Sequence, residues 1–299
     1  MATWVIDGSG AGGAEPRRRF SDDDKARIVS EAMVWMRKHS LIVIGLLVSG
    51  PAFAQDEPRF CPSRPSLGSS ACTTEPGQVH LEVSAVDRQH DRGADQQDDS
   101  LLLGDFQARI GVGPATEGQV GWTPYGFDRS RQPGGPSQRL QGTGDLALGV
   151  RQNLHNPDGK GLSYGIEASL TLPTGSRAIG EGDWGVGVDV PVSYQVSDLL
   201  SVTLTAEIDA AADEDRAGRH FAGDTIATVG FHPTNKVTLY TEAEFLRDLD
   251  PSGRSSKAYA AEGLAIRVSK RASLWAETVT GLNTASTDLR AFAGFSVLF

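Results

Sequence analysis

The feature that most constrains this chain is a two-residue alternation of apolar and polar residues along residues 161–196. Its first segment carries the apolar residues Leu162, Tyr164, Ile166, Ala168, Leu170 and Leu172. After a glycine-rich turn, the second carries Trp184, Val186, Val188, Val190, Val192 and Tyr194. A period of two places each set on one face of a β-strand. Each segment has about 11 to 13 residues, enough for a tilted strand to cross a bilayer, whereas strands of soluble proteins usually have about 5 to 6. The pattern predicts a transmembrane β-hairpin.

Similar segments recur from residue 78 to the C-terminus, and twelve can be counted. They begin near Val79, Phe106, Val120, Leu146, Leu162, Trp184, Leu200, Ala227, Val237, Leu264, Leu274 and Leu289. Longer polar connections alternate with shorter turns, and the longer ones are residues 87–100, 127–144, 173–183, 211–219, 247–257 and 281–288. We therefore expect an all-β fold over residues 78–299, a transmembrane antiparallel up-and-down β-barrel of about 12 strands. The mean hydropathy of −0.26 does not argue against this, because such strands alternate.

Residues 1–35 do not share the alternating pattern. Residues 17–32 contain a helix start, with Ser21 as the N-cap, Asp24 three residues later and Ile28 behind it. This stretch resembles the first helix of the helix-turn-helix region of insertion-sequence transposases, but a recognition helix does not follow it. We interpret residues 1–35 as a non-native or fused extension.

Residues 36–54 have the order of parts that a secretory signal peptide requires. Met36 is followed by basic Arg37 and Lys38, by an apolar run over residues 41–48, and by the Ala-Phe-Ala cleavage site of residues 52–54. The apolar run is too short for a transmembrane helix. We expect export through a signal peptide that starts at Met36.

Cys61 and Cys72 are the only cysteines of the sequence, and they lie in residues 55–77, which we expect to be a periplasmic linker. An even number of cysteines in an exported chain favours a disulfide. The C-x-x-C spacing of zinc sites and thioredoxin-like redox sites is absent from the sequence. A disulfide between Cys61 and Cys72 is therefore predicted.

Two short motifs add a family resemblance. The chain ends on an alternating segment with Phe295 and Phe299, which resembles the signal that the barrel assembly machinery of Gram-negative outer membranes recognises. The Leu-Pro-Thr-Gly turn of residues 172–175, followed by the glycine-rich residues 180–184, resembles the outer-membrane transporter family named for the MetA pathway of phenol degradation. The resemblance covers residues 55–299. It implies a porin-like channel in the lipid of the cell outer membrane for small solutes, with aromatic or other organic compounds among the candidates.

The polar face of the expected strands carries more acidic than basic side chains. The lumen-lining candidates are Glu82, Asp105, Arg109, Asp145, Arg151, Glu167, Asp189, Glu207, Asp209, Glu242 and Glu244. A solvated interior or a structural salt-bridge network explains such a set. A preference for cations, or a proton-linked binding network, is the functional alternative.

Catalytic, cofactor and metal sites are not expected. The histidines are scattered among turns and strand ends, without the serine partner on one outer face that a membrane lipase needs. We expect Trp122, Tyr125, Trp184, Tyr194 and Trp275 in interfacial aromatic girdles. The net charge of −10 argues against a nucleic-acid partner, which needs clustered Lys and Arg.

Two other interpretations remain open from the sequence, and a third is contradicted by it. A structural or enzymatic outer-membrane barrel with a plugged lumen is the first, because side chains can fill a twelve-stranded barrel. A soluble periplasmic β-protein is the second. A transposase-like DNA-binding protein is the third, and the signal peptide and the acidic sequence contradict it.

Overall fold

The computed structural model describes residues 58–93, 96–132 and 135–299, and the described chain is built from β-strands and their connections. Among these residues, no helix is long and apolar enough to cross a membrane. The predicted extension of residues 1–35 and the predicted signal peptide of residues 36–54 lie outside the described residues.

Fourteen strands follow one another along the described chain. They are β1 (Val79–Arg92), β2 (Gln97–Gly113), β3 (Thr116–Trp122), β4 (Tyr125–Arg131), β5 (Gln138–Gly142), β6 (Leu146–His155), β7 (Leu162–Leu172), β8 (Gly185–Ser197), β9 (Leu200–Ala212), β10 (Arg219–Thr234), β11 (Val237–Asp248), β12 (Ser255–Ser269), β13 (Ala272–Gly281) and β14 (Leu289–Leu298).

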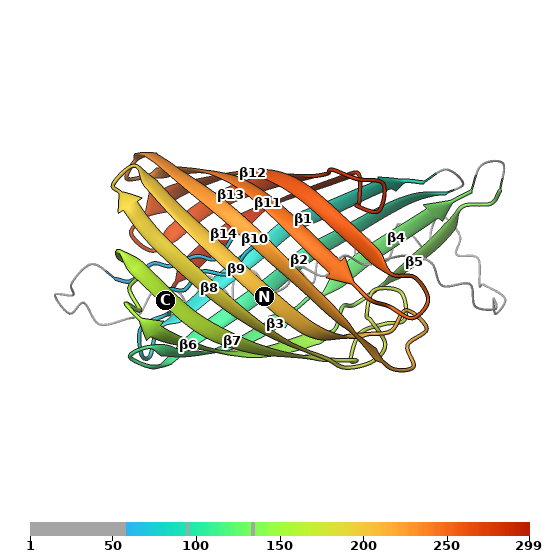
Figure 1. The fold of residues 1–299 in the computed structure, drawn as a ribbon, viewed down its shortest axis with the longest axis horizontal. Helices are drawn as coiled ribbons and strands as arrows, with labels where there is room; N and C mark the ends of the chain where they lie inside the picture. Colours follow the sequence, from blue (N-terminus) through green and yellow to red (C-terminus); the bar gives the residue numbers. More distant parts are fainter. Residues whose placement is uncertain (1–57, 94–95, 133–134) are drawn as a thin grey trace, which may run out of the picture. The chain divides into compact units, whose positions relative to one another are not determined.

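Twelve of these strands close into an antiparallel barrel, as the alternation predicts (Figure 1). Strands of the ring pair with their neighbours along the chain, except that β3 pairs with β6, and β1 closes the ring by pairing with both β2 and β14. The hairpin of residues 161–196 forms β7 and β8, in the register Glu167 opposite Asp189. Closure gives the strands of the ring a partner on both sides, as the interior of a bilayer requires.

The remaining hairpin, β4–β5, continues the wall beyond the end of β3. β2 is long enough to pair first with β3 and then with β4. Between β3 and β4, Thr123 and Pro124 interrupt the ladder, and proline has no N–H to donate. The strand is interrupted at the same level between β5 and β6. There the Gly144 N–H donates a hydrogen bond to the Thr123 carbonyl at 2.9 Å. The region 127–144, expected as one loop, therefore contains β4 in part and all of β5.

The two ends of the barrel differ in the length of their connections. Residues 114–115, 198–199, 235–236 and 270–271 form short turns at the end where β1 begins and β14 finishes. Residues 156–161 form one longer turn at the same end. At the other end only residues 93–96 separate β1 from β2, but most connections are longer, namely residues 173–184, 213–218, 249–254 and 282–288. Outer-membrane barrels have short periplasmic turns and longer extracellular loops. The longer connections therefore mark the extracellular end.

Several strands run further towards that end than the apolar alternation indicates. β1 continues to Arg92 and β2 starts at Gln97, inside the region 87–100 that was expected to be a loop. The backbone pairing continues there, from Arg88 opposite Leu101 to Arg92 opposite Gln97. The sequence signal is lost because both faces of the sheet become polar outside the bilayer.

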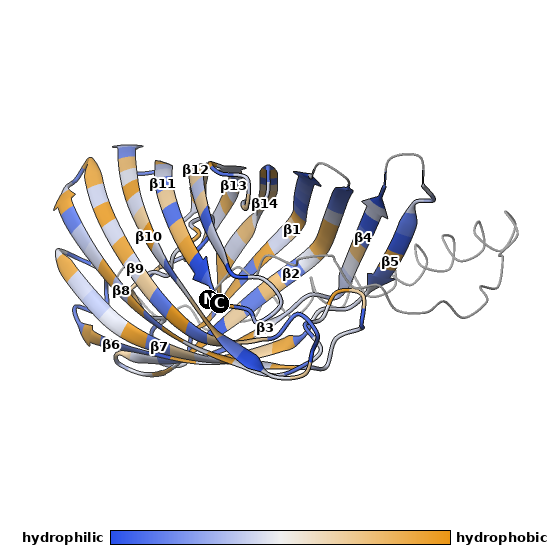
Figure 2. Cartoon of the chain, turned by 45° about the vertical axis from the view of Figure 1, so that its right-hand side comes forward, coloured by the Kyte–Doolittle hydropathy of each residue, from blue (hydrophilic) through white to orange (hydrophobic). Residues whose placement is uncertain are grey.

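The outer surface of the barrel is apolar and its interior is polar (Figure 2). Exposed aliphatic and aromatic residues cover the outside, among them Ile166, Val190, Leu204 and Phe245. Charged side chains such as Arg109 and Arg151 are fully buried on the inside. This is the reverse of a soluble protein, and it supports a membrane location.

The aromatic residues divide between the two faces. Trp122, Tyr125, Trp184 and Tyr194 are exposed on the outside, in agreement with a role in interfacial girdles. The prediction for Trp275 is wrong, because its side chain is 3% exposed and its indole N–H donates to the Ser296 hydroxyl at 3.0 Å. Trp275 alternates with the outward-facing Leu274, so its own side chain points into the lumen.

A charge placed on the outer surface tests whether this surface contacts lipid. Val190 lies at the middle of β8 and is 42% exposed, whereas Val196 lies near the short-turn end of the same strand and is 48% exposed. We expect Val190→Arg to lower the free energy of unfolding from liposomes by about 2–4 kcal/mol, and Val196→Arg by about 0–1 kcal/mol. Urea titration of both variants measures this difference. Equal losses would contradict a bilayer centred on the strands.

Candidate functional site

Residues 58–77, called here the luminal segment, precede β1 and contact the inward side chains of the barrel. They hydrogen-bond to residues of β1, β2, β3, β6, β9 and β11. This differs from the periplasmic linker that the sequence analysis expects. Hydrogen bonds to so many strands place the segment inside the barrel.

On one side, the luminal segment is held by acidic residues of β1 and β2. The backbone N–H groups of Ser63 and Arg64 donate to the Glu82 carboxylate at 3.0 and 2.8 Å. The Arg64 guanidinium donates to Asp105 at 2.6 Å. Glu82 is fully buried, so these charge-assisted bonds replace the water that its carboxylate would otherwise bind.

On the opposite side, Glu242 of β11 holds the centre of the luminal segment. Its carboxylate accepts hydrogen bonds from the Ser66 hydroxyl at 2.5 Å, the Leu67 N–H at 2.8 Å and the Thr228 hydroxyl at 2.8 Å. The Ser69 N–H donates to the Thr205 hydroxyl at 3.2 Å. Glu242 is 3% exposed, and three donors satisfy its buried charge.

The two cysteines lie within the luminal segment. Cys61 and Cys72 form a disulfide, with their Cα atoms 5.9 Å apart. Inward arginines bind the carbonyls of both cysteines, Arg109 that of Cys61 and Arg151 that of Cys72. The disulfide therefore closes the segment into a loop that the barrel wall holds at both ends.

Five buried charges form a continuous ladder across the wall beneath this loop. They alternate in sign in the order Glu82, Arg109, Glu117, Arg151 and Glu167, on β1, β2, β3, β6 and β7. Successive N–O distances along the first three links are 2.9, 3.3 and 3.2 Å, and the Arg151 Nε donates to Glu167 at 2.7 Å. All five side chains are at most 1% exposed. Each inner charge has a partner of opposite sign on either side, which offsets its desolvation.

The luminal segment also binds the ladder directly. The Thr74 N–H donates to Glu117 at 2.7 Å, next to the contacts of Arg109 and Arg151 with the same carboxylate. The ladder and the luminal segment are therefore one hydrogen-bonded unit.

The other acidic candidates lie outside this ladder. Asp189 and Glu207 are cross-strand partners, 4% and 6% exposed, and Asp209 lies opposite Gly187. Glu244 of β11 lines a cavity nearer the extracellular end. These residues line the interior as the alternation predicts, but they are not members of the salt-bridge ladder.

Asp145 lines a cavity beside residues 63–68, and it also binds an extracellular loop. It lies in the break between β5 and β6 and accepts hydrogen bonds from the Gly175 N–H at 2.6 Å and the Glu181 N–H at 2.7 Å. It thereby folds the extracellular loop of residues 173–184 back onto the barrel, where the Ile179 side chain is buried. Burial, with Asp145 and Asp209 nearby, raises the pKa of the Glu181 carboxyl to about 7.

Sequence reasoning missed several interior residues. Glu117 links two arginines, and extending the alternation of Val120 backwards along β3 would have found it. Glu277 follows Trp275 on the inward face of β13. Arg290 binds Asp87 across β14 and β1, with the Arg290 Nε 3.0 Å from a carboxylate oxygen. The apolar alternation places Asp87 in the expected loop of residues 87–100, whereas β1 in fact continues through Asp87 to Arg92.

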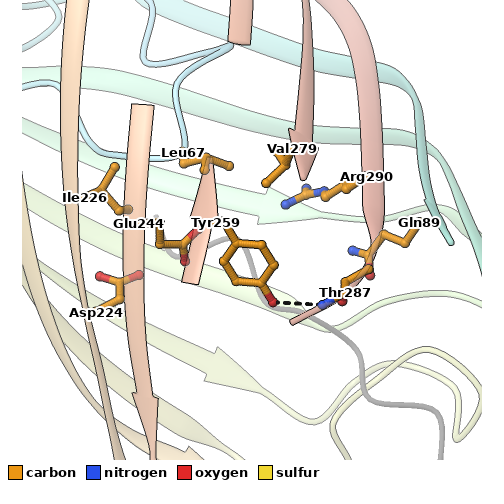
Figure 3. A pocket seen from close by; sticks show the side chains of 9 residues that line it. All are labelled: Leu67, Gln89, Asp224, Ile226, Glu244, Tyr259, Val279, Thr287 and Arg290. Carbon is orange, nitrogen blue, oxygen red and sulfur yellow. Dashed lines mark hydrogen bonds between the residues drawn. The ribbon is translucent and has the colours of Figure 1, made fainter. Parts of the chain in front are cut away.

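Two cavities lie beside the luminal segment. The smaller has a volume of about 20 Å³, enough for one water, and Leu67 forms one side of it (Figure 3). Its other lining is partly apolar, from Ile226, Tyr259 and Val279, and partly charged. The larger has about 160 Å³, and residues of the luminal segment and the loop at Glu181 both line it. Free space therefore remains around the segment.

One cluster at the extracellular end has the residue types of a metal site. Single ligand atoms of Asp213, His220 and Asp250 lie within 4.8 Å of one another. His220 Nδ1 is 3.0 Å from Asp213 and 3.3 Å from Asp250, while its Nε2 is 2.9 Å from Asp248. These contacts tie β10 to the end of β11 and to the neighbouring loops.

The family model described as "Putative MetA-pathway of phenol degradation" matches residues 62–299. The chain belongs to this family. The match begins within the luminal segment and extends to the end of the sequence. A comparison with curated proteins finds no match.

Two solved structures are similar to this chain to different degrees. The COG4313 outer membrane channel from Pseudomonas putida F1 has a TM-score of 0.61 at 15% identity, over 76% of this chain and 97% of that chain. The NanC porin gives 0.46 at 9% identity, over 73% and 99%. The first likeness supports the barrel fold.

Removing the centre of the ladder tests its contribution to stability. We expect Glu117→Gln to lower the free energy of unfolding by about 3–5 kcal/mol, because two buried arginines lose the charge between them. Asp158→Asn is the control, since Asp158 pairs with Lys160, whose side chain is 87% exposed, and such pairs contribute about 0–1 kcal/mol. Urea unfolding in liposomes gives both values. A loss for Glu117→Gln no larger than that of the control would contradict the role of the ladder.

Proposed function

We propose that the protein is an outer-membrane channel for small solutes and that the luminal segment is its gate. The observation that carries this proposal is the way Glu242 holds the centre of the segment, through hydrogen bonds to Ser66 and Leu67. Of the residues of the segment, Leu67 alone joins the buried apolar cluster of the lumen. Such charge-assisted bonds contribute about 1.5–3 kcal/mol each, and they can be exchanged for bonds to water when both partners become solvated. The centre of the segment, around Ser66 and Leu67, can therefore leave the wall while its two ends stay bound to the barrel.

Two further observations support a gate. The segment is joined to β1 at Gly77, which has a positive φ of 79° and ends the segment before the first strand. Cavities of about 20 and 160 Å³ adjoin the segment, so it is not packed on all sides. A purely structural plug gains stability from close packing, whereas a gate needs space in which to move.

Weakening the contact at Glu242 is expected to open the channel. Glu242→Gln removes the negative charge that accepts three hydrogen bonds, and a charge-assisted bond contributes about 1.5–3 kcal/mol. The flux of small solutes through reconstituted liposomes is expected to rise about tenfold or more. Glu244→Gln is the matched control, on the same strand and the same face.

Three outcomes of these flux measurements distinguish a gated channel from a plugged structural barrel. Raised flux in Glu242→Gln with unchanged flux in Glu244→Gln supports the gate. Equal flux in both variants contradicts it. If neither Glu242→Gln nor a Cys61→Ser/Cys72→Ser variant conducts, the barrel is a plugged structural one instead.

We propose that the solutes are small organic molecules, aromatic ones included, and that cations pass more readily than anions. The family description supports the first part, as do the apolar Ile226, Tyr259 and Val279 beside the luminal segment. The buried acidic pair Asp189 and Glu207 supports the second. In Glu242→Gln liposomes, benzylammonium should cross faster than benzoate. Faster entry of benzoate would refute the charge preference without refuting the gate.

We also propose that the chain reaches the outer membrane through a signal peptide starting at Met36 and through the barrel assembly machinery, guided by Phe295 and Phe299. Phe295 lies on the outward face of β14, which supports this role. Expression from Met36 should give a mature chain beginning at Gln55, measured by mass spectrometry of purified membranes. Phe299→Ala should lower its heat-modifiable, folded fraction several-fold. A mature chain that still contains residues 36–54 would refute the signal peptide.

A further inference from the structure

The extracellular ends of four neighbouring strands carry a group of outward-facing arginines, called here the arginine patch. β1 and β2, β2 and β4, and β4 and β5 are adjacent pairs. The members of the patch are Arg88, Arg92, Arg129, Arg131 and Arg139. Figure 2 shows these strand ends as strongly hydrophilic.

The register places the patch on the outer face of the wall. Asp87 and Gln89 flank Arg88 along β1, and both are buried on the luminal side. Arg88 itself faces outward, with 67% of its side chain exposed. On β4, the buried Asp128 precedes Arg129, so Arg129 faces outward as well.

The patch begins where the apolar outer surface ends. The outward residues along β4 are Tyr125, Phe127, Arg129 and Arg131 in that order. Along β1, the exposed Val86 immediately precedes Arg88 on the same face. Two residues of a strand span about 7 Å. Arg88 and Arg129 therefore lie about one such step beyond the lipid-facing surface, at the depth of the headgroups of the outer leaflet, and Arg131 and Arg92 lie one and two steps further out.

The charge of this surface is opposite to that of the chain as a whole. The sequence has a net charge of −10. Along the described parts of these four strand ends, the acidic residue on the outward face is Asp99, which contacts Arg88 at 3.5 Å and His90 at 2.9 Å. Arg129 lies directly opposite Asp99 on one side and Arg139 on the other. The arginines of the patch therefore outnumber the outward acidic residue beside them.

We infer that the arginine patch binds the phosphate groups of a phosphorylated, acylated glycolipid of the outer leaflet. Arginine guanidinium groups pair with phosphate oxygens through two parallel hydrogen bonds. The adjoining apolar residues Val86, Leu103 and Tyr125 are exposed and contact the acyl chains of the same lipid. This adjacency favours a lipid over free phosphate, which has no apolar part.

Lipid A with two phosphates is the probe for this site, added to the purified full-length protein in detergent and followed by native mass spectrometry. Replacing Arg88, Arg129 and Arg131 by Gln should weaken its binding about tenfold or more. A variant with Arg177, Arg247 and Arg254 replaced by Gln makes the same charge change away from the patch, and it should bind as the unchanged protein does. Binding should survive EDTA, because arginines need no divalent cation to hold phosphate.

A second arm changes the lipid and leaves the protein unchanged, so it does not depend on the folding of a variant. Dephosphorylated lipid A should bind the unchanged protein about tenfold or more weakly. Equal binding of the two lipids, or equal binding by the two triple variants, would overturn the inference. Competition by inorganic phosphate at concentrations similar to those of lipid A would also overturn it, in favour of a free-anion site.

Discussion

The structure depends on one constraint: in a bilayer, every backbone N–H and C=O must find its partner within the protein. Pairing of β1 with both β2 and β14 meets this constraint by closing the ring. Closure in turn forces each strand to present one face to lipid and one to the lumen. The apolar outside and the charged inside are both consequences of that alternation.

A charged lumen then has to be satisfied in a narrow space. The ladder from Glu82 to Glu167 does so by alternating charges across five strands. The luminal segment supplies further backbone donors, such as the Arg64 and Thr74 N–H groups. The same acidic side chains that make the interior polar therefore also hold the segment, and its proposed release as a gate rests on the hydrogen bonds of Glu242.

The candidate site was predictable only in part. Arg109, Arg151 and Glu167 were found because they alternate with apolar residues, and a period of two fixes their face without knowledge of the register. Glu117 and Trp275 were missed or misplaced because their strands carry few apolar residues and the alternation was not extended to them. Asp145 lines a cavity of the lumen, but its hydrogen bonds to the loop of residues 173–184 depend on the connection between β5 and β6, which the alternation does not reveal.

The sequence by itself determined the barrel, its approximate strand number, the inward face of most strands and the cysteine pair, because these follow from local periodicity and composition. Tertiary structure decided which charges meet, how far the strands continue outside the bilayer, and that residues 58–77 lie in the lumen. These depend on contacts between residues far apart in the chain, such as Leu67 with Glu242. A segment without periodicity carries no local signal of what surrounds it.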